Sequence, residues 1–100
     1  MPDHAHLTDL EQLLLLAVLR CEDEAYGANL QADIEHEAGR HVSLGSIHMT
    51  LARLEERGLA SSRKSAPQAS RGGKARRIYR VTEEGRATLE WNRHVMNRMW

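Results

Sequence analysis

The chain has 100 residues, 41% of them hydrophobic and 28% charged, and its 14 Lys and Arg residues balance 14 Asp and Glu residues. This composition is typical of one globular domain and excludes a disordered chain. No apolar run reaches the roughly 20 residues that span a bilayer, the N-terminal residues lack a signal-peptide pattern, and a single cysteine excludes an internal disulfide, so we expect a cytoplasmic protein without a membrane partner.

The first predicted element is a helix over residues 9–20. Thr8 and Glu11 form a Thr-x-x-Glu capping box in front of a leucine-rich run. The apolar residues of this run lie on more than one face of a helix, so the helix must be covered on several sides. We expect contacts with its own domain and, through Leu13 and Leu16, with a second subunit.

A second helix is predicted over residues 26–38. Tyr26, Leu30 and Ile34 repeat at i, i+4 and i+8, and Gly39 is placed to end the helix. Ser43, a good N-cap, follows after about five connecting residues. Two short helices joined by a tight turn predict a helix-turn-helix, whose second helix enters the major groove of DNA.

The third predicted helix follows Ser43 and closes at Gly58. Its apolar stripe, expected to face inward, consists of Leu44, Ile47, Leu51 and Leu54. The opposite stripe and its neighbours are the candidate DNA contacts, although such a polar face is also typical of a merely solvated helix. These candidates are Ser43, Ser46, His48, Met49, Thr50, Arg53 and Arg57.

Each type of side chain in this set has its own use at a DNA surface. Serine and threonine hydroxyls bond phosphates or base edges, the planar fork of Arg53 reads guanine, and Met49 contacts a thymine methyl group. Gly45 costs the helix about 1 kcal/mol relative to alanine. We expect this cost to be offset by a close approach of the backbone to a phosphate.

A β-hairpin with a long loop is predicted over residues 59–81. Tyr79 and Val81 are expected to face the core, and Pro67 and Gly72-Gly73 break the strand pattern between its two arms. Residues 59–80 hold seven Lys and Arg and no acidic residue, whereas residues 1–58 hold four against eleven. Such asymmetry favours a polyanionic partner, although a solvated basic loop has the same signature. The candidate contacts to phosphates or the minor groove are Arg71, Lys74, Arg76 and Arg77.

The last predicted helix begins after Thr82, a good N-cap with two glutamates behind it. Its tryptophan and methionine stripe is typical of a dimer seam. Two facing tryptophans would also form a flat apolar slot for a small apolar or planar ligand. Together with Leu13 and Leu16, the residues of this helix assigned to the dimer or ligand site are Leu89, Trp91, Val95, Met96 and Met99.

These elements predict a mainly α fold with a small β-hairpin, a winged helix-turn-helix followed by a C-terminal dimerisation helix. Residues 1–81 are the DNA-binding domain, with the wing at 59–81, and residues 82–100 are the dimerisation helix. No set of side chains suited to catalysis, to a structural metal or to a cofactor is apparent. The acidic residues around Cys21 are expected to raise the pKa of its thiol. We therefore expect neither an enzyme nor a bound cofactor.

Three fragments resemble the PadR-like transcriptional regulators: "YGANLQADI", "VSLGSIHMTLARLEERGL" and "GGKARRIYRVTEEG". They span nearly the whole chain in the order of the family. His48 departs from the pattern, since family members usually carry tyrosine there, and the terminal helix is as short as in the short-tailed branch. The resemblance implies homodimeric repressors that bind operator DNA, often near genes for detoxification or export, with the terminal helix making the dimer.

The leading hypothesis is thus a sequence-specific regulator that binds double-stranded DNA. It would be a homodimeric repressor on an inverted-repeat operator, released by a small-molecule inducer. The alternative is a winged-helix protein-interaction module that does not bind DNA and instead docks a partner through its acidic first two helices.

Overall fold

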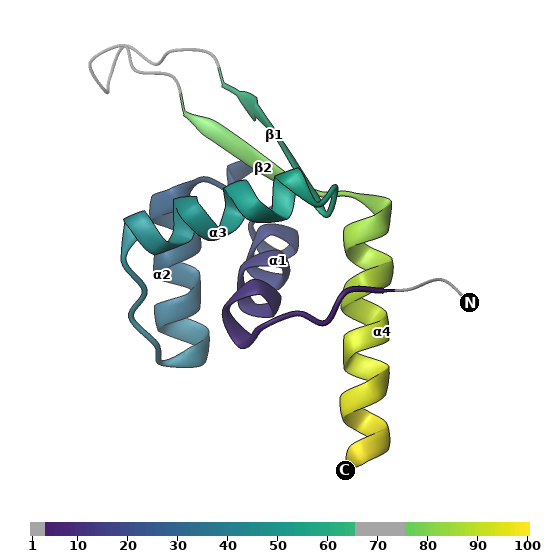
Figure 1. Ribbon diagram of the computed structural model, residues 1–100. Helices are drawn as coiled ribbons and strands as arrows, with labels where there is room; N and C mark the ends of the chain where they lie inside the picture. The colour runs from purple at the N-terminus through teal and green to yellow at the C-terminus, as the bar shows by residue number, and fades with distance from the viewer. Residues whose placement is uncertain (1–3, 66–75) are drawn as a thin grey trace.

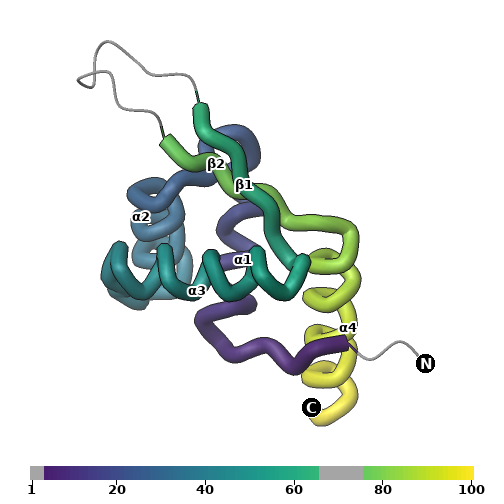
Figure 2. Tube along the Cα trace, turned by 45° about the horizontal axis from the view of Figure 1, so that its top comes forward, coloured from purple at the N-terminus to yellow at the C-terminus, as the bar shows by residue number. Residues whose placement is uncertain are grey.

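Four α-helices, one short 3-10 helix and one hairpin are present in the part of the chain that the computed structural model describes, residues 4–65 and 76–100. In both views α3 lies across α1 and α2, and the hairpin projects from the side of the molecule on which α3 lies. Helix α4 runs along the flank opposite α2 (Figures 1 and 2). The predicted fold class is confirmed. The elements are α1 (Asp9–Cys21), the short 3-10 helix η1 (Glu22–Glu24), α2 (Gly27–Ala38), α3 (Leu44–Glu56), β1 (Ala60–Lys64), β2 (Arg77–Val81) and α4 (Glu83–Met99).

Helix ends fall where the sequence places them, because local side-chain hydrogen bonds fix them. The capping box is present: the Glu11 N–H donates to Thr8 Oγ1 at 3.2 Å, and the Thr8 N–H donates to Glu11 Oε1 at 2.8 Å. Ser43 caps α3, and Gly39 ends α2 with a φ of 63°. The second helix begins one residue later than expected, with Tyr26 as its N-cap.

The hydrophobic core lies beneath α3. Ile47, Leu51 and Leu54 of the predicted inward stripe have no exposed area. The prediction for Leu44 is wrong, because its side chain is 43% exposed. This residue opens the first turn of α3 at the edge of the core, and its Cδ2 lies 3.6 Å from where a Cβ on Gly27 would be. It therefore covers the start of α2.

The hairpin is antiparallel, with its ladder running from the pair Ala60 and Val81 to the pair Lys64 and Arg77. Tyr79 is buried as predicted, and Val81 packs against the core while half-buried. Ile78, which strict alternation places on the other face, is also buried. On that face Ile78 shares a hollow with Asp23, Glu24 and Tyr26, and at the edge of β2 the Tyr79 N–H donates to the Ala25 carbonyl oxygen at 2.9 Å.

Helix α4 is held to the domain at its N-terminal half. A Cβ on Gly85 would overlap the Leu59 carbonyl oxygen, so the two backbones touch. Further along, the buried Asn92 Oδ1 accepts from the Leu7 N–H and Asn92 Nδ2 donates to the Ala5 oxygen, both at 2.9 Å. The segment before α1 thus lies against α4, as both views show (Figures 1 and 2).

Candidate nucleic-acid interface

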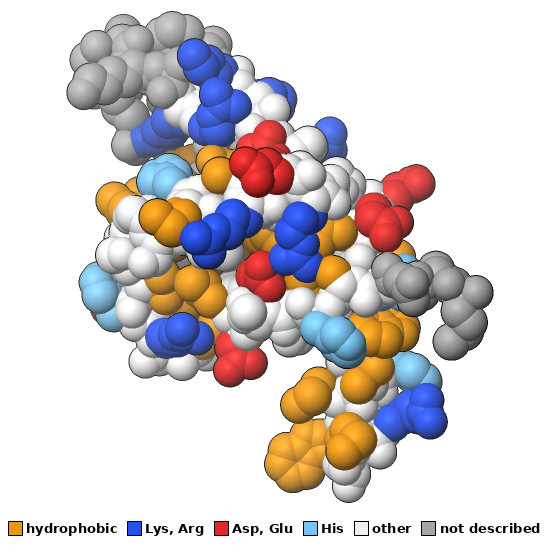
Figure 3. All heavy atoms as spheres, viewed as in Figure 1, with side chains coloured by type: hydrophobic (Ala, Val, Ile, Leu, Met, Phe, Trp, Pro, Cys, Tyr) orange, Lys and Arg blue, Asp and Glu red, His pale blue; other side chains and the backbone are white. Residues whose placement is uncertain are grey.

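The outer face of α3 is exposed over its whole length. Ser43, Ser46, His48, Met49, Arg53 and Arg57 are exposed, and Thr50 is half-buried. Met49 stands out because a large apolar side chain is 58% exposed among polar ones. Figure 3, which looks onto this face, shows Lys and Arg side chains over α3 and the hairpin, with acidic side chains among them.

The two arginines of this face have different surroundings. Arg57 Nη1 donates to Glu11 Oε2 at 2.8 Å, and the exposed fractions of the two side chains are 35% and 12%. Arg57 therefore ties the end of α3 to the capping box of α1. Within residues 4–65 and 76–100, Arg53 makes no ion pair. Its guanidinium is the better placed of the two to read a base.

Two of the four predicted wing residues, Arg71 and Lys74, lie outside the described residues. Arg77 is exposed, and its Nη1 donates to Ser62 Oγ at 2.9 Å. That hydroxyl in turn donates to Glu55 Oε1 of α3, also at 2.9 Å. Arg77 is thus two hydrogen bonds away from α3, so the structure brings the third helix and the base of the wing together.

Arg76 behaves differently from its neighbour. It is half-buried, and its guanidinium carbon lies 3.9 Å from the centre of the Tyr26 ring. This is a cation–π contact between β2 and the residue that caps α2. The sequence patterns assign Tyr26 to the apolar side of the second helix and do not indicate this pairing.

His48 lies on the α2 side of α3. A Cβ added to Gly27 would be 3.0 Å from Cε1 and 3.1 Å from Nε2 of the imidazole ring. The ring therefore rests on the first residue of α2. Glycine fits there because any side chain would push the ring away.

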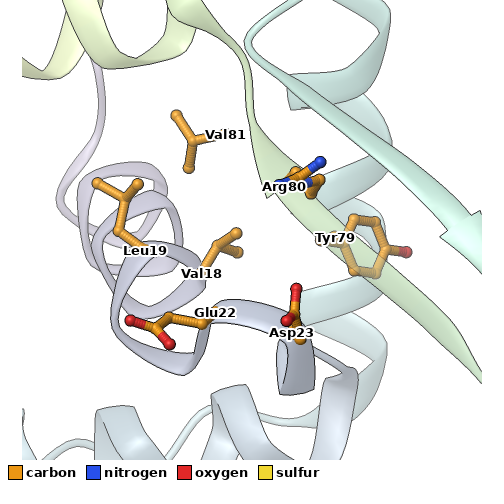
Figure 4. A pocket seen from close by; sticks show the side chains of 7 residues that line it. All are labelled: Val18, Leu19, Glu22, Asp23, Tyr79, Arg80 and Val81. Carbon is orange, nitrogen blue, oxygen red and sulfur yellow. The ribbon is translucent and has the colours of Figure 1, made fainter.

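A separate hollow on another side of the molecule is lined by residues of α1, η1 and β2. Figure 4 shows an apolar wall of Val18, Leu19 and Val81, with the carboxylates of Glu22 and Asp23 across from Arg80. Burial, and secondarily the charge of Glu55, raises the pKa of the Tyr79 phenol, which remains protonated at neutral pH. The hollow therefore holds charged side chains and a protonated phenol.

The expectation for Cys21 is confirmed in direction. Burial raises the pKa of its thiol most, and Asp33 raises it further. A thiol with a raised pKa is mostly protonated at neutral pH and reacts poorly as a nucleophile.

No described helix is long and apolar enough to cross a membrane.

An apolar surface extends over the outer sides of α1 and α4. Leu16 is 46% exposed and Met96 is 54% exposed, and both line a hollow with Leu19 and Leu89. Met99 is almost fully exposed, and Figure 3 shows hydrophobic side chains gathered at the free end of α4. Leu13 and Val95 are half-buried. A surface of this kind is typical of a protein interface.

Trp91 lies away from that hollow. Two residues along an α-helix turn it by about 200°, so Trp91 is on the opposite side of α4 from Leu89. Its ring is 5.9 Å from that of His4 and 5.0 Å from that of His6, centre to centre. The two histidines belong to the segment that Asn92 holds against α4, a buried amide that the sequence patterns did not single out.

The sequence of this chain is similar to those of known transcriptional regulators. The model of the "Transcriptional regulator PadR-like family" matches residues 15–91. A transcriptional regulator of Mycobacterium tuberculosis is 36% identical over 78 residues, covering 78% of this chain and 68% of that protein.

Solved structures agree with the fold. A PadR-like transcriptional regulator from Bacillus cereus is 26% identical, with a TM-score of 0.72, over 90% of this chain and 82% of that one. The PadR of Bacillus subtilis, solved in complex with operator DNA, has a TM-score of 0.69 at 19% identity, over 83% of this chain and 46% of that one. At 19% identity, the similarity to the Bacillus subtilis protein shows the fold alone.

Proposed function

Because the chain belongs to the PadR-like family of transcriptional regulators, we propose that it binds double-stranded DNA sequence-specifically in the cytoplasm and represses transcription. The observation that carries the proposal is the exposed face of α3, with Met49 and Arg53, lying beside a hairpin whose two strands hold four Lys and Arg. The operator complex of the Bacillus subtilis PadR supports the same use of this fold.

In this proposal α3 enters the major groove and the wing holds the flanking backbone or minor groove. Arg53 reads a guanine, Met49 contacts a thymine methyl, and Ser43, Ser46, His48 and Thr50 bond phosphates or base edges. Gly45 is exposed, and nothing lies within 4 Å of where its Cβ would be. That open space suits the close approach of a phosphate. The proposal assigns no catalytic role to any residue.

We also propose a homodimer formed through α1 and the C-terminal helix, residues 82–100. The exposed Leu16 and Met96 support it, and burying them is worth about 25 cal/mol for each Å² removed from water. A twofold dimer demands an inverted-repeat operator with half-site centres about 34–36 Å apart, or a multiple of this spacing.

Met96→Glu is expected to convert the dimer to a monomer in light scattering, because the carboxylate would have to lose its water in the interface. Met49→Glu is the matched control, since Met49 is exposed to a similar degree, 58% against 54%. It should leave the dimer intact and weaken DNA binding by charge repulsion. A dimeric Met96→Glu variant would place the interface elsewhere.

The proposed inducer is a small apolar or planar molecule bound between the subunits, which changes their spacing and so releases DNA. Trp91 tests whether this molecule also reaches the side of α4 opposite Leu89, where the Trp91 ring lies beside His4 and His6. In a Trp100→Phe background Trp91 is the only tryptophan, and titration with planar aromatic cations is expected to quench its fluorescence and to weaken DNA binding at matching concentrations. Quenching without any loss of DNA binding would contradict an inducer role.

A gel shift with the DNA upstream of the gene tests the function itself. A shifted band that survives an excess of unrelated competitor DNA is expected. No shift at low salt would overturn the proposal and favour the protein-interaction alternative.

A further inference from the structure

We propose that Tyr26 and Arg76 are positioning residues that hold the wing at a fixed place relative to α3. We call this pair the wing clamp. The inference rests on the proposed function and adds to it, because it assigns Arg76 a role that charge alone does not indicate.

Arg76 and Tyr26 are in direct contact. The Arg76 guanidinium carbon lies 3.9 Å from the centre of the Tyr26 ring, so a cationic face and an aromatic face are stacked. Both residues are half-buried and line one hollow with Asp23 and Glu24. The guanidinium of Arg76 therefore rests on the Tyr26 ring, so it is less free to reach a phosphate than the side chain of a fully exposed arginine.

Arg76 lies at the start of the second arm of the hairpin, just before β2. Its N–H donates to Ser65 Oγ at 3.0 Å, and its carbonyl accepts from the Ser65 N–H at 2.6 Å. Arg76 thus belongs to the pair that continues the ladder beyond Lys64 and Arg77. The contact between Arg76 and Tyr26 holds the hairpin at this pair. Together with the hydrogen bond from the Tyr79 N–H to the Ala25 carbonyl oxygen, it fixes β2 along its length.

The start of α2 lies between the wing and α3. The ring of Tyr26 contacts the guanidinium of Arg76. The next residue, Gly27, contacts the imidazole ring of His48 on α3. Two consecutive residues at the start of α2 therefore touch the wing on one side and α3 on the other. Their rigid backbone sets the distance between the two elements that are proposed to grip DNA.

A double-mutant cycle on operator DNA tests the wing clamp, with Tyr26→Leu, Arg76→Gln and the double variant. A cation–π contact of this exposure predicts a loss of affinity of about five-fold for each single variant, and no further loss in the double variant, because either change removes the same contact. Tyr26→Phe keeps the aromatic face and is expected to bind like the parent.

Salt dependence separates positioning from direct contact. The wing clamp predicts that Arg76→Gln leaves the log–log salt slope of DNA binding unchanged, whereas loss of a phosphate contact would reduce its magnitude by about 0.9. A reduced slope, or an Arg76→Gln loss of the same size in the Tyr26→Leu background, would overturn the inference.

Hydrogen exchange on the free protein tests the wing clamp without DNA. The amides of Ser65 and Tyr79 are expected to exchange several times faster in Tyr26→Leu and in Arg76→Gln than in the parent. The amides of α4 in these two variants, and all amides in Tyr26→Phe, are expected to exchange at the rates of the parent. Unchanged exchange in both variants would overturn the inference. If the parent binds no DNA, the proposed function fails, and this exchange experiment still decides whether the wing clamp exists.

Discussion

Gly85→Ala is expected to lower the free energy of unfolding by about 3 kcal/mol, at the upper end of the usual range for overpacking. A Cβ at this position would overlap the Leu59 carbonyl oxygen and press on Val81 Cγ1 at 2.9 Å. The carbonyl is backbone and cannot rotate away as a side chain would. Relief requires α4 to move from the start of the hairpin, which also strains the Thr82 cap.

Urea denaturation followed by circular dichroism measures this effect, and Gly45→Ala is its matched control. Gly45 is also in the first turn of a helix, but nothing lies within 4 Å of its Cβ position. Alanine there is expected to raise the free energy of unfolding by about 0.5–1 kcal/mol while it weakens DNA binding. Equal stability of Gly85→Ala and the parent would contradict the close approach of α4.

Arg53→Ala is expected to weaken binding to the operator by about 10- to 100-fold and to relax specificity at one base pair, since a bidentate arginine–guanine contact is worth about 1–3 kcal/mol. Binding to unrelated DNA should change far less. The reason is that Arg53 is exposed on α3 and makes no ion pair in the described part of the chain, so its guanidinium is available to a base edge.

Fluorescence anisotropy with the operator and with a set of single-base variants measures both effects. Arg98→Ala is the control, because it removes an equal charge from the exposed last turn of α4. If Arg53→Ala and Arg98→Ala bound the operator equally well, α3 would not be the reading helix as proposed.

The sequence predicts the elements well because their ends are fixed locally. Thr8 with Glu11, Ser43 and Thr82 each cap a helix within three residues, and Gly39 ends one by its own backbone conformation. Interactions of this range are visible in a single sequence. They place the helices and the hairpin, and with them the exposed face of α3.

Long-range contacts are beyond such patterns. Arg57 pairs with Glu11, which is 46 positions away in the sequence. Asn92 Oδ1 accepts a hydrogen bond from the Leu7 N–H, which is 85 positions away. Nothing in the spacing of these residues indicates a partner, so the sequence predicts a DNA contact for Arg57 and no role for Asn92. Only the packing of α3 and α4 on α1 shows these roles.

The two errors of burial have the same origin. The helical stripe predicted an inward Leu44, but the core ends before the first turn of α3 reaches it. Alternation along β2 places Ile78 on the face opposite Tyr79, but Ile78 is buried as well, on a side where Asp23, Glu24 and Tyr26 lie close to it. Periodicity gives the face of a residue and not the extent of what lies against that face.

The central claim is that a basic wing and the face of α3 together bind DNA, and the salt dependence of that binding tests it most directly. Binding of the parent to its upstream DNA should weaken steeply with salt, and Arg77→Ala, which removes an exposed cation at the base of the wing, should reduce the magnitude of the log–log slope by about 0.9. Binding that does not change with salt in the parent, or an absence of binding at low salt, would contradict the account.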